Sequence, residues 1–498
     1  MVNRDWYMPT KPNLLFICSD QQRTDTVGAY GNDWIQTPAL NELSGRSFVF
    51  ENAYVTQPVC SPARSTMVTG LYPHAAGVVR NSQPGRQMSN LFPDVATIAE
   101  MVSDDYVCAK YGKWHLGDDL NPQRGFTDWV STEDAHDDNH PTWVDPADRK
   151  KKSDYFEYLA SRGHEPEGDH EGHKSYTQEQ RGYFPMEDTM AMFLSRNTVD
   201  FVNQRAVDGK PWLMYLNMFE PHPPYNGPLN DMYDPDSLDM GPLFLKKPEV
   251  NTPAFNRVRS EFHMAEAERI KPGDAERYWR EIRARYFGNV TVLDRSIAPI
   301  LSALKNTGQL DKTIVVFTSD HGDSLGDRGM LMKRSFYEEV ARVPLIIHVP
   351  WLSGKQTRVD GSIGHVDLVP TMLDLMGMEV PQTLQGISRK KVLEGTSNLD
   401  DDVFMQWHGG AATISLGDAE FDRLSEIPWR SMVSGDRWKL NLSPDDTCEL
   451  YDLSSDPLEL TNLYDDPGQA TRIKDMTVRM QDWQVKVGDD LDLISNSH

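Results

Sequence analysis

One cysteine of this 498-residue chain stands where the sequence favours a reactive thiol. Cys60 precedes Ser61-Pro62, and this pair predicts the start of a short helix, with Ser61 as the N-cap and Pro62 at the first helical position. The positive end of that helix would favour an anion at Cys60. Arg64 follows about one turn later, close enough to support a group at the helix start. From these residues alone, Cys60 is a candidate nucleophile, and a thiol enzyme such as a Cys–His protease is one interpretation.

Two aspartates far apart in the sequence each end an apolar, strand-like run. Asp20 ends the run Asn13–Asp20, and Asp320 ends the run Thr313–Asp320. Ligands of open α/β sheets bind beyond the carboxyl ends of the strands, so the two carboxylates are candidates to converge on one site. There they could hold a divalent cation. The alternative role is that of a helix N-cap after each strand.

The elements that must position these residues alternate along the chain. Short apolar runs, such as Pro211–Phe219 and Val343–Val349, alternate with helical patterns such as Ala275–Leu304. This alternation predicts an α/β fold with a large mixed, mostly parallel sheet flanked by helices. We expect this catalytic domain to span residues 11–394.

After about Glu394 the pattern changes to short strands separated by turns. It predicts a smaller C-terminal antiparallel-sheet subdomain, residues 395–498, closed by the amphipathic helix Ile473–Val487. The predicted strands are Val403–Trp407, Trp429–Val433, Trp438–Leu442 and Cys448–Tyr451.

The tract Asp134–Ser175 differs from both parts. It is rich in charged residues and contains five histidines, namely His136, His140, His164, His170 and His173. Such polar tracts rarely pack, so we expect a solvated insertion. A histidine metal site and an active-site lid are the alternatives. Together with Asn226–Thr252 and the C-terminal sheet, this tract is expected to wall the substrate pocket.

Charge and hydropathy exclude several classes of function. Lys and Arg total 50 and Asp and Glu total 75, so the net charge is −25, which argues against nucleic acid and anionic membranes as partners. No apolar run approaches the roughly 20 residues that span a bilayer. The first residues, MVNRDWYMPTKPN, lack the pattern of a signal peptide, so a cytoplasmic location is expected, with a periplasmic or secreted location as the alternative if a leader has been removed. The four cysteines form no CxxC pair and are too few for a disulfide scaffold.

Five segments, in order along the chain, resemble those of the type I sulfatases, a formylglycine-dependent family of the alkaline phosphatase superfamily. Together they are far more specific than any one motif. The fold that this resemblance implies agrees with the strand pattern above. The segments are Asp20 after the first strand, Cys60-x-Pro62-x-Arg64 followed by Thr69-Gly70, GKWHLG at 112–117, PHPP at 221–224, and SDHGD at 319–323 with Lys333.

The resemblance implies a reaction and a maturation step. Cys60 would be oxidised to 3-oxoalanine (Cα-formylglycine) by a formylglycine-generating enzyme. One hydroxyl of the aldehyde hydrate would attack sulfur and displace the alcohol of a carbohydrate or aryl sulfate. The second hydroxyl would then expel inorganic sulfate from the sulfated intermediate, a step that a serine could not perform.

The resemblance also implies a role for each matching residue. Arg64 would stabilise the hydrate, Lys113 would bind sulfate oxygens, and His115 would take the hemiacetal proton. His222 and Lys333 would contact the bridging oxygen or protonate the leaving group. One divalent metal ion would be held by Asp20, Gln21, residue 60, Asp320 and His321.

Two of the implied metal ligands depart from the commonest sulfatase pattern. Gln21 stands where many members have Asp, and His321 stands where many have Asn. Oxygen ligands suit calcium, which is the expected ion, whereas the nitrogen of His321 makes manganese acceptable. Gln and His also occur at these places in phosphonate monoester hydrolases. A phosphonate monoester or phosphodiester hydrolase is therefore the alternative enzyme, and a binding protein that kept the fold is the third hypothesis. Lys113, His115 and Lys333 favour the sulfatase, and the sequence carries no prediction of the oligomeric state.

Overall fold

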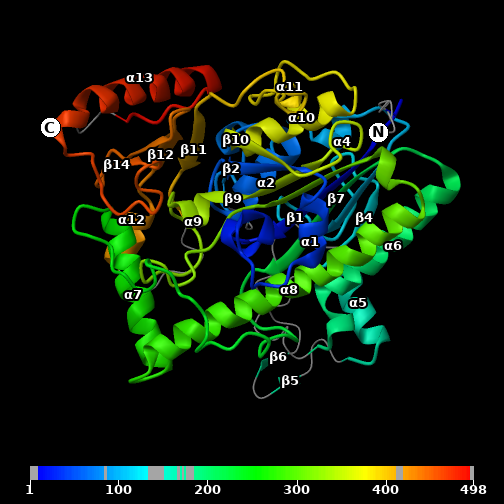
Figure 1. Cartoon of the computed structure of the whole chain (residues 1–498), viewed down its shortest axis with the longest axis horizontal. Helices are drawn as coiled ribbons and strands as arrows, with labels where there is room; N and C mark the ends of the chain where they lie inside the picture. The colour runs from blue at the N-terminus through cyan, green and yellow to red at the C-terminus, as the bar shows by residue number, and fades with distance from the viewer. Residues whose placement is uncertain are drawn as a thin grey trace.

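The computed structural model describes residues 9–82, 87–132, 151–164, 184–410 and 419–493, together with the backbone of 169–170 and 173–174. Within them, eight strands form one large sheet (Figure 1). Their order across the sheet is β10 (Thr357–Gly364), β2 (Phe48–Tyr54), β9 (Arg342–His348), β8 (Thr313–Ser319), β1 (Asn13–Asp20), β7 (Trp212–Pro221), β3 (Val107–Gly112) and β4 (Asp128–Val130).

The strand directions confirm the predicted mixed, mostly parallel sheet. Five neighbouring strands, from β8 to β4, run parallel to one another. Strand β9 is antiparallel to both of its neighbours, and β10 pairs in parallel with β2. Because β1 lies between β7 and β8, its whole length is buried, which explains its nearly continuous apolar sequence.

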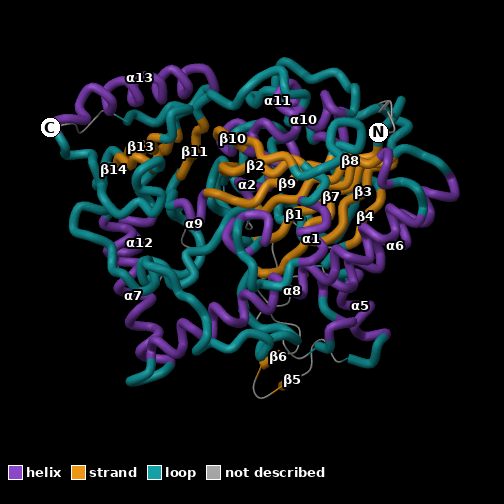
Figure 2. Tube along the Cα trace, in the orientation of Figure 1, coloured by secondary structure: helices purple, strands orange, loops and turns teal. Residues whose placement is uncertain are grey.

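Both faces of the sheet are covered by helices. This is required because successive apolar side chains of β1 point to opposite faces. Leu14 and Phe16 belong to one core, with side chains from α2 (Cys60–Thr69) and α10 (Leu368–Leu375). Leu15 and Ile17 belong to the other, with side chains from α6 (Met190–Asp208) and α8 (Ala275–Asn306). Figure 2 shows α8 and α6 on one side of the strands and α10 on the other.

The C-terminal part forms a separate antiparallel sheet, also as predicted. Its strands lie in the order β11 (Val403–Trp407), β12 (Trp429–Val433), β13 (Trp438–Leu442) and β14 (Glu449–Asp452). The last helix, α13 (Ala470–Val487), packs Met476 and Met480 against this sheet. The opposite core joins Trp407 and Trp429 to Phe336 of the larger part. The division at residues 394 and 395 stays a prediction.

Part of the expected solvated insertion packs instead. Residues 134–150, with His136 and His140, lie outside the described residues. Helix α5 (Asp154–Ser161) is capped by Ser153 and buries Tyr155 and Leu159 in the core beside α6. Further along, Nε2 of His164 lies 2.7 Å from Oδ2 of Asp188. The prediction was wrong for this stretch because it considered only the high content of charged residues. It overlooked the apolar residues, which recur at helical spacing.

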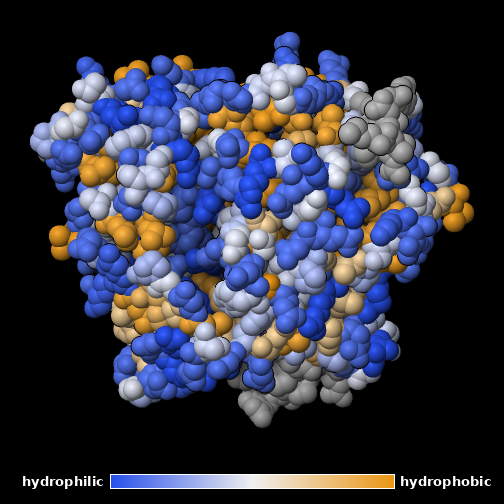
Figure 3. Space-filling model, viewed as in Figure 1, coloured by the Kyte–Doolittle hydropathy of each residue, from blue (hydrophilic) through white to orange (hydrophobic). Residues whose placement is uncertain are grey.

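The remaining helices are mostly short and occupy the connections between strands. None of the helices in the described ranges is both long and apolar enough to cross a bilayer. On the face in Figure 3, hydrophilic residues predominate, with smaller hydrophobic groups between them. These helices are α1 (Pro38–Ser44), α3 (Pro73–Ala76), α4 (Ile98–Met101), α7 (Ala254–Ile270), α9 (Glu338–Ala341), α11 (Lys390–Leu393) and α12 (Ala419–Ser425).

Candidate active site

Candidate residues lie at the ends of four adjacent parallel strands, at the same edge of the large sheet. Asp20 is the last residue of β1, and Asp320 directly follows β8. Lys113 directly follows β3, and His222 directly follows β7. Since Ser19 pairs with Ser319 in the register of β1 and β8, the two aspartates lie side by side. The topology therefore brings together residues that are up to 300 positions apart, Asp20 and Asp320 being the extreme pair (320 − 20).

Arg64 joins the two carboxylates. Its Nη2 lies 3.1 Å from Oδ2 of Asp20 and 2.8 Å from Oδ2 of Asp320, and its Nε donates to Asp320 at 2.9 Å. Its Nη1 donates to the carbonyl of Lys113. The guanidinium is 2% exposed, so this is a buried cation between two buried anions. Such an arrangement holds the carboxylates in fixed orientations.

The helix that presents Cys60 begins differently from the prediction. Helix α2 starts at Cys60 itself, with Val59 as an N-cap that makes no side-chain hydrogen bond, and ends at Gly70, whose φ is 68°. The Ser61 hydroxyl donates to the carbonyl of His115 at 2.6 Å and accepts from the Ser82 amide. Ser61 thus ties the helix to the segment after β3 rather than capping it.

Four candidate ligand atoms for a cation lie within 4.8 Å of one another, one each from Asp20, Cys60, Asp320 and His321. The His321 Nε2 lies 3.3 Å from the Cys60 Sγ, and 3.8 and 3.6 Å from the Oδ1 atoms of Asp20 and Asp320. All four side chains are buried. The two Oδ2 atoms are engaged by Arg64, so the Oδ1 atoms face the imidazole.

The chemistry of these donors fits a divalent cation. The Nδ1 of His321 lies 2.9 Å from the carbonyl of Gly322, so an Nδ1 proton is held there and the lone pair of Nε2 points into the cluster. Carboxylate oxygens suit Ca²⁺, and the added imidazole nitrogen suits Mn²⁺ as well. The Sγ of Cys60 stands in for the oxygen that oxidation would place at this position.

Gln21, the remaining predicted ligand, is held at both ends of its amide. It takes a left-handed φ of 68° directly after β1. Its Oε1 accepts from the Lys333 ammonium at 3.1 Å, and its Nε2 donates to Asp323 at 2.6 Å. Its backbone amide donates to Asp320. The side chain therefore borders the cluster, with its oxygen directed at Lys333.

Two lysines place positive charge beside residue 60. The Nζ of Lys333 lies 2.8 Å from the Cys60 Sγ, and the Nζ of Lys113 lies 3.0 Å from Oδ2 of Asp20. Burial raises the pKa of the Cys60 thiol, but Lys333, Lys113 and His321 outweigh it and bring the pKa well below its usual value. The site consequently stabilises an anionic group at this place.

Asp20 remains ionised for a related reason. Burial and the neighbouring Cys60 raise the pKa of its carboxyl, but Lys113 and Arg64, with His222 when its ring is protonated, lower it below the ordinary value. The positive groups around the cluster thus sustain a carboxylate in a buried position, which is the state that metal ligation requires.

His222 lies between Lys333 and the backbone. Its Nε2 is 3.2 Å from the Lys333 Nζ, and its Nδ1 is 2.6 Å from the carbonyl of Pro223. Burial, together with the charges of Lys333 and Lys113, lowers its pKa. The neutral ring donates through Nδ1 and accepts from Lys333 through Nε2, which aims the ammonium towards residue 60.

His115 reaches the site by a turn rather than by an extended strand. The segment from Lys113 to His115 was expected to alternate as a strand does, but β3 ends at Gly112 and His115 has a φ of 60°. The His115 ring hydrogen-bonds towards Cys60 and lowers its pKa. Trp114 still points away, into the core beside Phe126.

Two positioning side chains were missed by the sequence analysis. Asp323 accepts from the Gln21 amide and from the Tyr225 hydroxyl at 2.5 Å, and its other oxygen accepts from the amides of Leu325 and Met332. It therefore fixes the loop that carries Lys333. Its place in the SDHGD segment was a usable signal, whereas nothing in the sequence marks Tyr225.

Comparisons with known proteins agree with this architecture. A family model described as Sulfatase matches residues 12–378, and one described as N-sulphoglucosamine sulphohydrolase, C-terminal, matches residues 326–486. The chain is 29% identical to the uncharacterized sulfatase YidJ of Escherichia coli, over 95% of this chain and 86% of that protein. It is 25% identical to the N-acetylglucosamine-6-O-sulfatase of Bacteroides thetaiotaomicron, over 96% and 87%. The phosphonate monoester hydrolase of Silicibacter pomeroyi shares the fold, with a TM-score of 0.77, 24% identity and 96% of each chain covered.

Proposed function

Because this chain belongs to the sulfatase family, as its five sequence segments predicted, and is thus a sulfuric ester hydrolase, we propose how its site performs the reaction. The chain releases inorganic sulfate from an organic sulfate ester, with formylglycine at position 60 as the nucleophile and one divalent cation beside it. The observation that carries the proposal is the cluster of Asp20, Cys60, Asp320 and His321, within 4.8 Å, next to two lysines.

The residues that would hold the cation are Asp20, Asp320, His321 and residue 60. Gln21, whose side-chain oxygen accepts from Lys333, borders them. When bound, a divalent cation supplies Lewis acidity to a sulfate oxygen. The formylglycine, made by a formylglycine-generating enzyme, supplies as its hydrate a hydroxyl nucleophile and a second hydroxyl for its own regeneration. Arg64 holds the two carboxylates in place, since its guanidinium contacts both.

Lysines in this site offset the negative charge of the sulfate group. Lys113 lies against Asp20 and over the ring of Phe219, with its Nζ 4.9 Å from the ring centroid. From there it can bind a sulfate oxygen in a buried setting, where a charge-assisted hydrogen bond is strong. His115, half-buried beside residue 60, accepts a proton from that residue.

The leaving alcohol takes its proton from Lys333. Its ammonium lies 2.8 Å from the Cys60 Sγ and donates to His222, whose lowered pKa keeps the ring neutral. Lys333 is thus the proton donor nearest the reacting position, and His222 orients it.

Two measurements test this proposal together. The first is the mass of the tryptic peptide that carries residue 60, from protein made in its native host, which is expected to contain an aldehyde in place of the thiol. The second is hydrolysis of 4-nitrophenyl sulfate by the same preparation. An unmodified thiol in a fully active preparation would refute the nucleophile.

Phosphonate monoester hydrolysis is the second candidate function, and Gln21 and His321 favour it. Gln21 stands where many sulfatases have an acid, so the cluster carries one fixed negative charge fewer, and a phosphonate monoester hydrolase shares the fold of this chain. Parallel assays with 4-nitrophenyl sulfate and 4-nitrophenyl phenylphosphonate separate the two. We expect the larger kcat/KM for the sulfate, and a much larger value for the phosphonate would reverse the assignment.

A further inference from the structure

Lys333 lies on a short segment whose backbone is strained. Its neighbours Met332 and Arg334 have φ angles of 65° and 85°, in the left-handed region that residues other than glycine disfavour. Such a backbone persists only where the surrounding structure holds it. From this segment the Lys333 ammonium reaches the Cys60 Sγ at 2.8 Å and the Gln21 Oε1 at 3.1 Å. The position of the proposed proton donor therefore depends on the contacts that fix these few residues.

One arginine of α7, Arg259, holds most of this segment. Its Nη2 donates to the carbonyls of Leu331 and Lys333, at 3.0 and 2.6 Å, and its Nη1 donates to the carbonyl of Arg334 at 3.3 Å. A guanidinium suits this role because its donors lie in one rigid plane. Three of the four main-chain carbonyls from residue 331 to residue 334 are thus fixed by a single side chain.

Arg259 is a buried cation without an anionic partner. The residue is 3% exposed, and among the described residues it forms no ion pair with a carboxylate. Burial and the nearby charge of Arg334 lower its pKa to about 9, so the side chain still carries its charge at pH 7. A buried cation with no anion beside it costs free energy on folding. The charge does strengthen its hydrogen bonds, and these go to the segment that carries Lys333.

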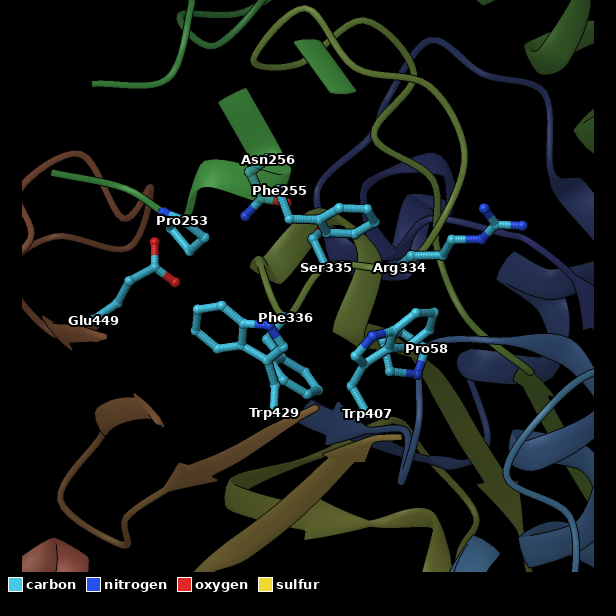
Figure 4. A pocket seen from close by; sticks show the side chains of 10 residues that line it. All are labelled: Pro58, Pro253, Phe255, Asn256, Arg334, Ser335, Phe336, Trp407, Trp429 and Glu449. Carbon is cyan, nitrogen blue, oxygen red and sulfur yellow. The ribbon is translucent and has the colours of Figure 1, made fainter. Parts of the chain in front are cut away.

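The helix that carries this arginine is itself fixed on two sides. One turn further along α7, the Nδ1 of His263 accepts from the Leu331 amide at 3.3 Å, and burial lowers the pKa of this histidine to about 3, which keeps the ring neutral. At the start of α7, the carboxylate of Asp446, between β13 and β14, accepts from the first two amides. Figure 4 shows Phe255 of α7 beside Ser335, which follows the strained segment. The helix is therefore a firm support for the segment.

We propose that Arg259 is a positioning residue for Lys333, because it holds the strained backbone from which the ammonium reaches residue 60. The inference rests on the proposed function, in which Lys333 gives its proton to the leaving alcohol. Without the three hydrogen bonds, Met332 and Arg334 relax towards ordinary backbone angles, and the ammonium moves away from the reacting position. A displacement of about 1 Å can lower a rate by about a hundredfold. The expected defect therefore resembles loss of the proton donor, although the hydrogen bonds of Arg259 go to the backbone.

The test compares two aryl sulfates that differ in their need for a proton. Phenolate is more basic than 4-nitrophenolate, so the cleavage of phenyl sulfate depends more on a proton donor. The quantity measured is the ratio of kcat/KM for phenyl sulfate to kcat/KM for 4-nitrophenyl sulfate, with formylglycine at position 60. We expect Arg259→Gln to lower this ratio by about tenfold. Lys333→Ala should lower it at least as far, and adding Arg259→Gln to Lys333→Ala should lower it no further.

Arg430→Gln is the matched control for the loss of a buried arginine. Arg430 is 1% exposed, donates to the carbonyls of Trp407 and Trp429, and pairs with Asp489, all in the C-terminal part. This variant should have a lower melting temperature and an unchanged ratio. Arg259→Lys keeps the charge but not the planar set of donors, so it should lower the ratio in the same direction. It replaces Arg259→Gln if that variant does not fold.

The outcomes distinguish this inference from the proposed function. If Lys333→Ala lowers the ratio but the Arg259 variant that folds leaves it unchanged, the positioning role is overturned and the proton donor stands. A further fall of the ratio on adding Arg259→Gln to Lys333→Ala, or an equal fall in Arg430→Gln, also overturns the positioning role. If Lys333→Ala itself leaves the ratio unchanged, the proposed proton donor fails, and the positioning role fails with it.

Discussion

The charged centre around residue 60 and the small aromatic pocket lined by Phe336, Trp407 and Trp429, where the C-terminal sheet meets the larger part, are built in opposite ways. In the charged centre, the protein pairs its own groups, as Arg64 does with Asp20 and Asp320. In the pocket, polar atoms such as Oδ1 of Asn256 face aromatic walls without a partner among the described residues. The first region is complementary to the negative charge of a sulfate, whereas the second is an apolar contact between the C-terminal sheet and the larger part. We therefore expect changes in the centre to lower the turnover of every sulfate ester and changes in the pocket to act on stability.

The largest effect is expected for Cys60→Ala. Removing the nucleophile should lower kcat/KM by more than about a thousandfold for aryl and saccharide sulfates alike. The melting temperature should stay close to that of wild type, because Cys60 lies at the start of α2 and outside the hydrophobic clusters. Differential scanning fluorimetry and parallel assays measure both. Substantial remaining activity on either substrate would remove residue 60 from the mechanism.

Loss of the cation should have the next largest effect. Chelation is expected to lower both activities by about a hundredfold or more, and Ca²⁺ or Mn²⁺ to restore them. A readout independent of turnover is the rise in melting temperature on adding either ion, which Asp320→Asn should abolish. The pocket variant Asn256→Leu should retain that rise. If Asp320→Asn keeps the ion-dependent rise, the cation does not bind at this cluster.

Lys333→Ala should separate substrates by their leaving groups, because Lys333 is proposed as the proton donor. An alcohol of a sugar needs a proton to depart, whereas 4-nitrophenolate does not. We expect the loss in kcat/KM to be about tenfold to a hundredfold larger for the saccharide sulfate. The exposed Lys391→Ala serves as the charge-matched control. Equal losses on both substrates would assign Lys333 to sulfate binding alone.

The smallest effect is expected for His365, which lies beside Thr318 of β8 and belongs to neither region. His365 is fully buried beside the Thr318 hydroxyl, and burial lowers its pKa to about 3. Its pKa in the unfolded chain is about 6.5, so the unfolded state binds the proton more readily. The stability that it contributes is present above that value and is lost as pH falls from about 6.5 towards 3.

His365→Gln should therefore weaken the fall in melting temperature between pH 7 and pH 5 by about 2–4 °C. The kcat/KM at pH 7 should not change, because His365 lies outside both regions. Melting curves across that pH range measure the difference. A slope identical to that of wild type would show that other groups cause the acid sensitivity.

Much of the large sheet and of the charged centre follows from local sequence. The buried strands ending at Asp20 and Ser319 were predictable because continuous apolar runs of that length have few other stable environments. The placement of a catalytic group just after each strand follows from the rule for open sheets. The resemblance of the five segments to those of sulfatases identified Arg64, Lys113 and Lys333 as site residues. The spacing of residues alone does not select them.

The tertiary structure decided what depends on contacts between distant segments. Ser61 was predicted as a cap because its type suits one, but the nearby carbonyl of His115 engages its hydroxyl instead. Asp323 and Tyr225 meet across almost a hundred residues, and no local pattern encodes that meeting. The same holds for the pocket, in which Asn256, Ser335 and Trp407 come from three separate stretches of chain. The sequence by itself thus determined which groups could act on a sulfate, because strand ends and motifs are local. Only the packing of distant segments decided how those groups meet, because the Lys333 ammonium, the Cys60 side chain and the two carboxylates come together only in the folded chain.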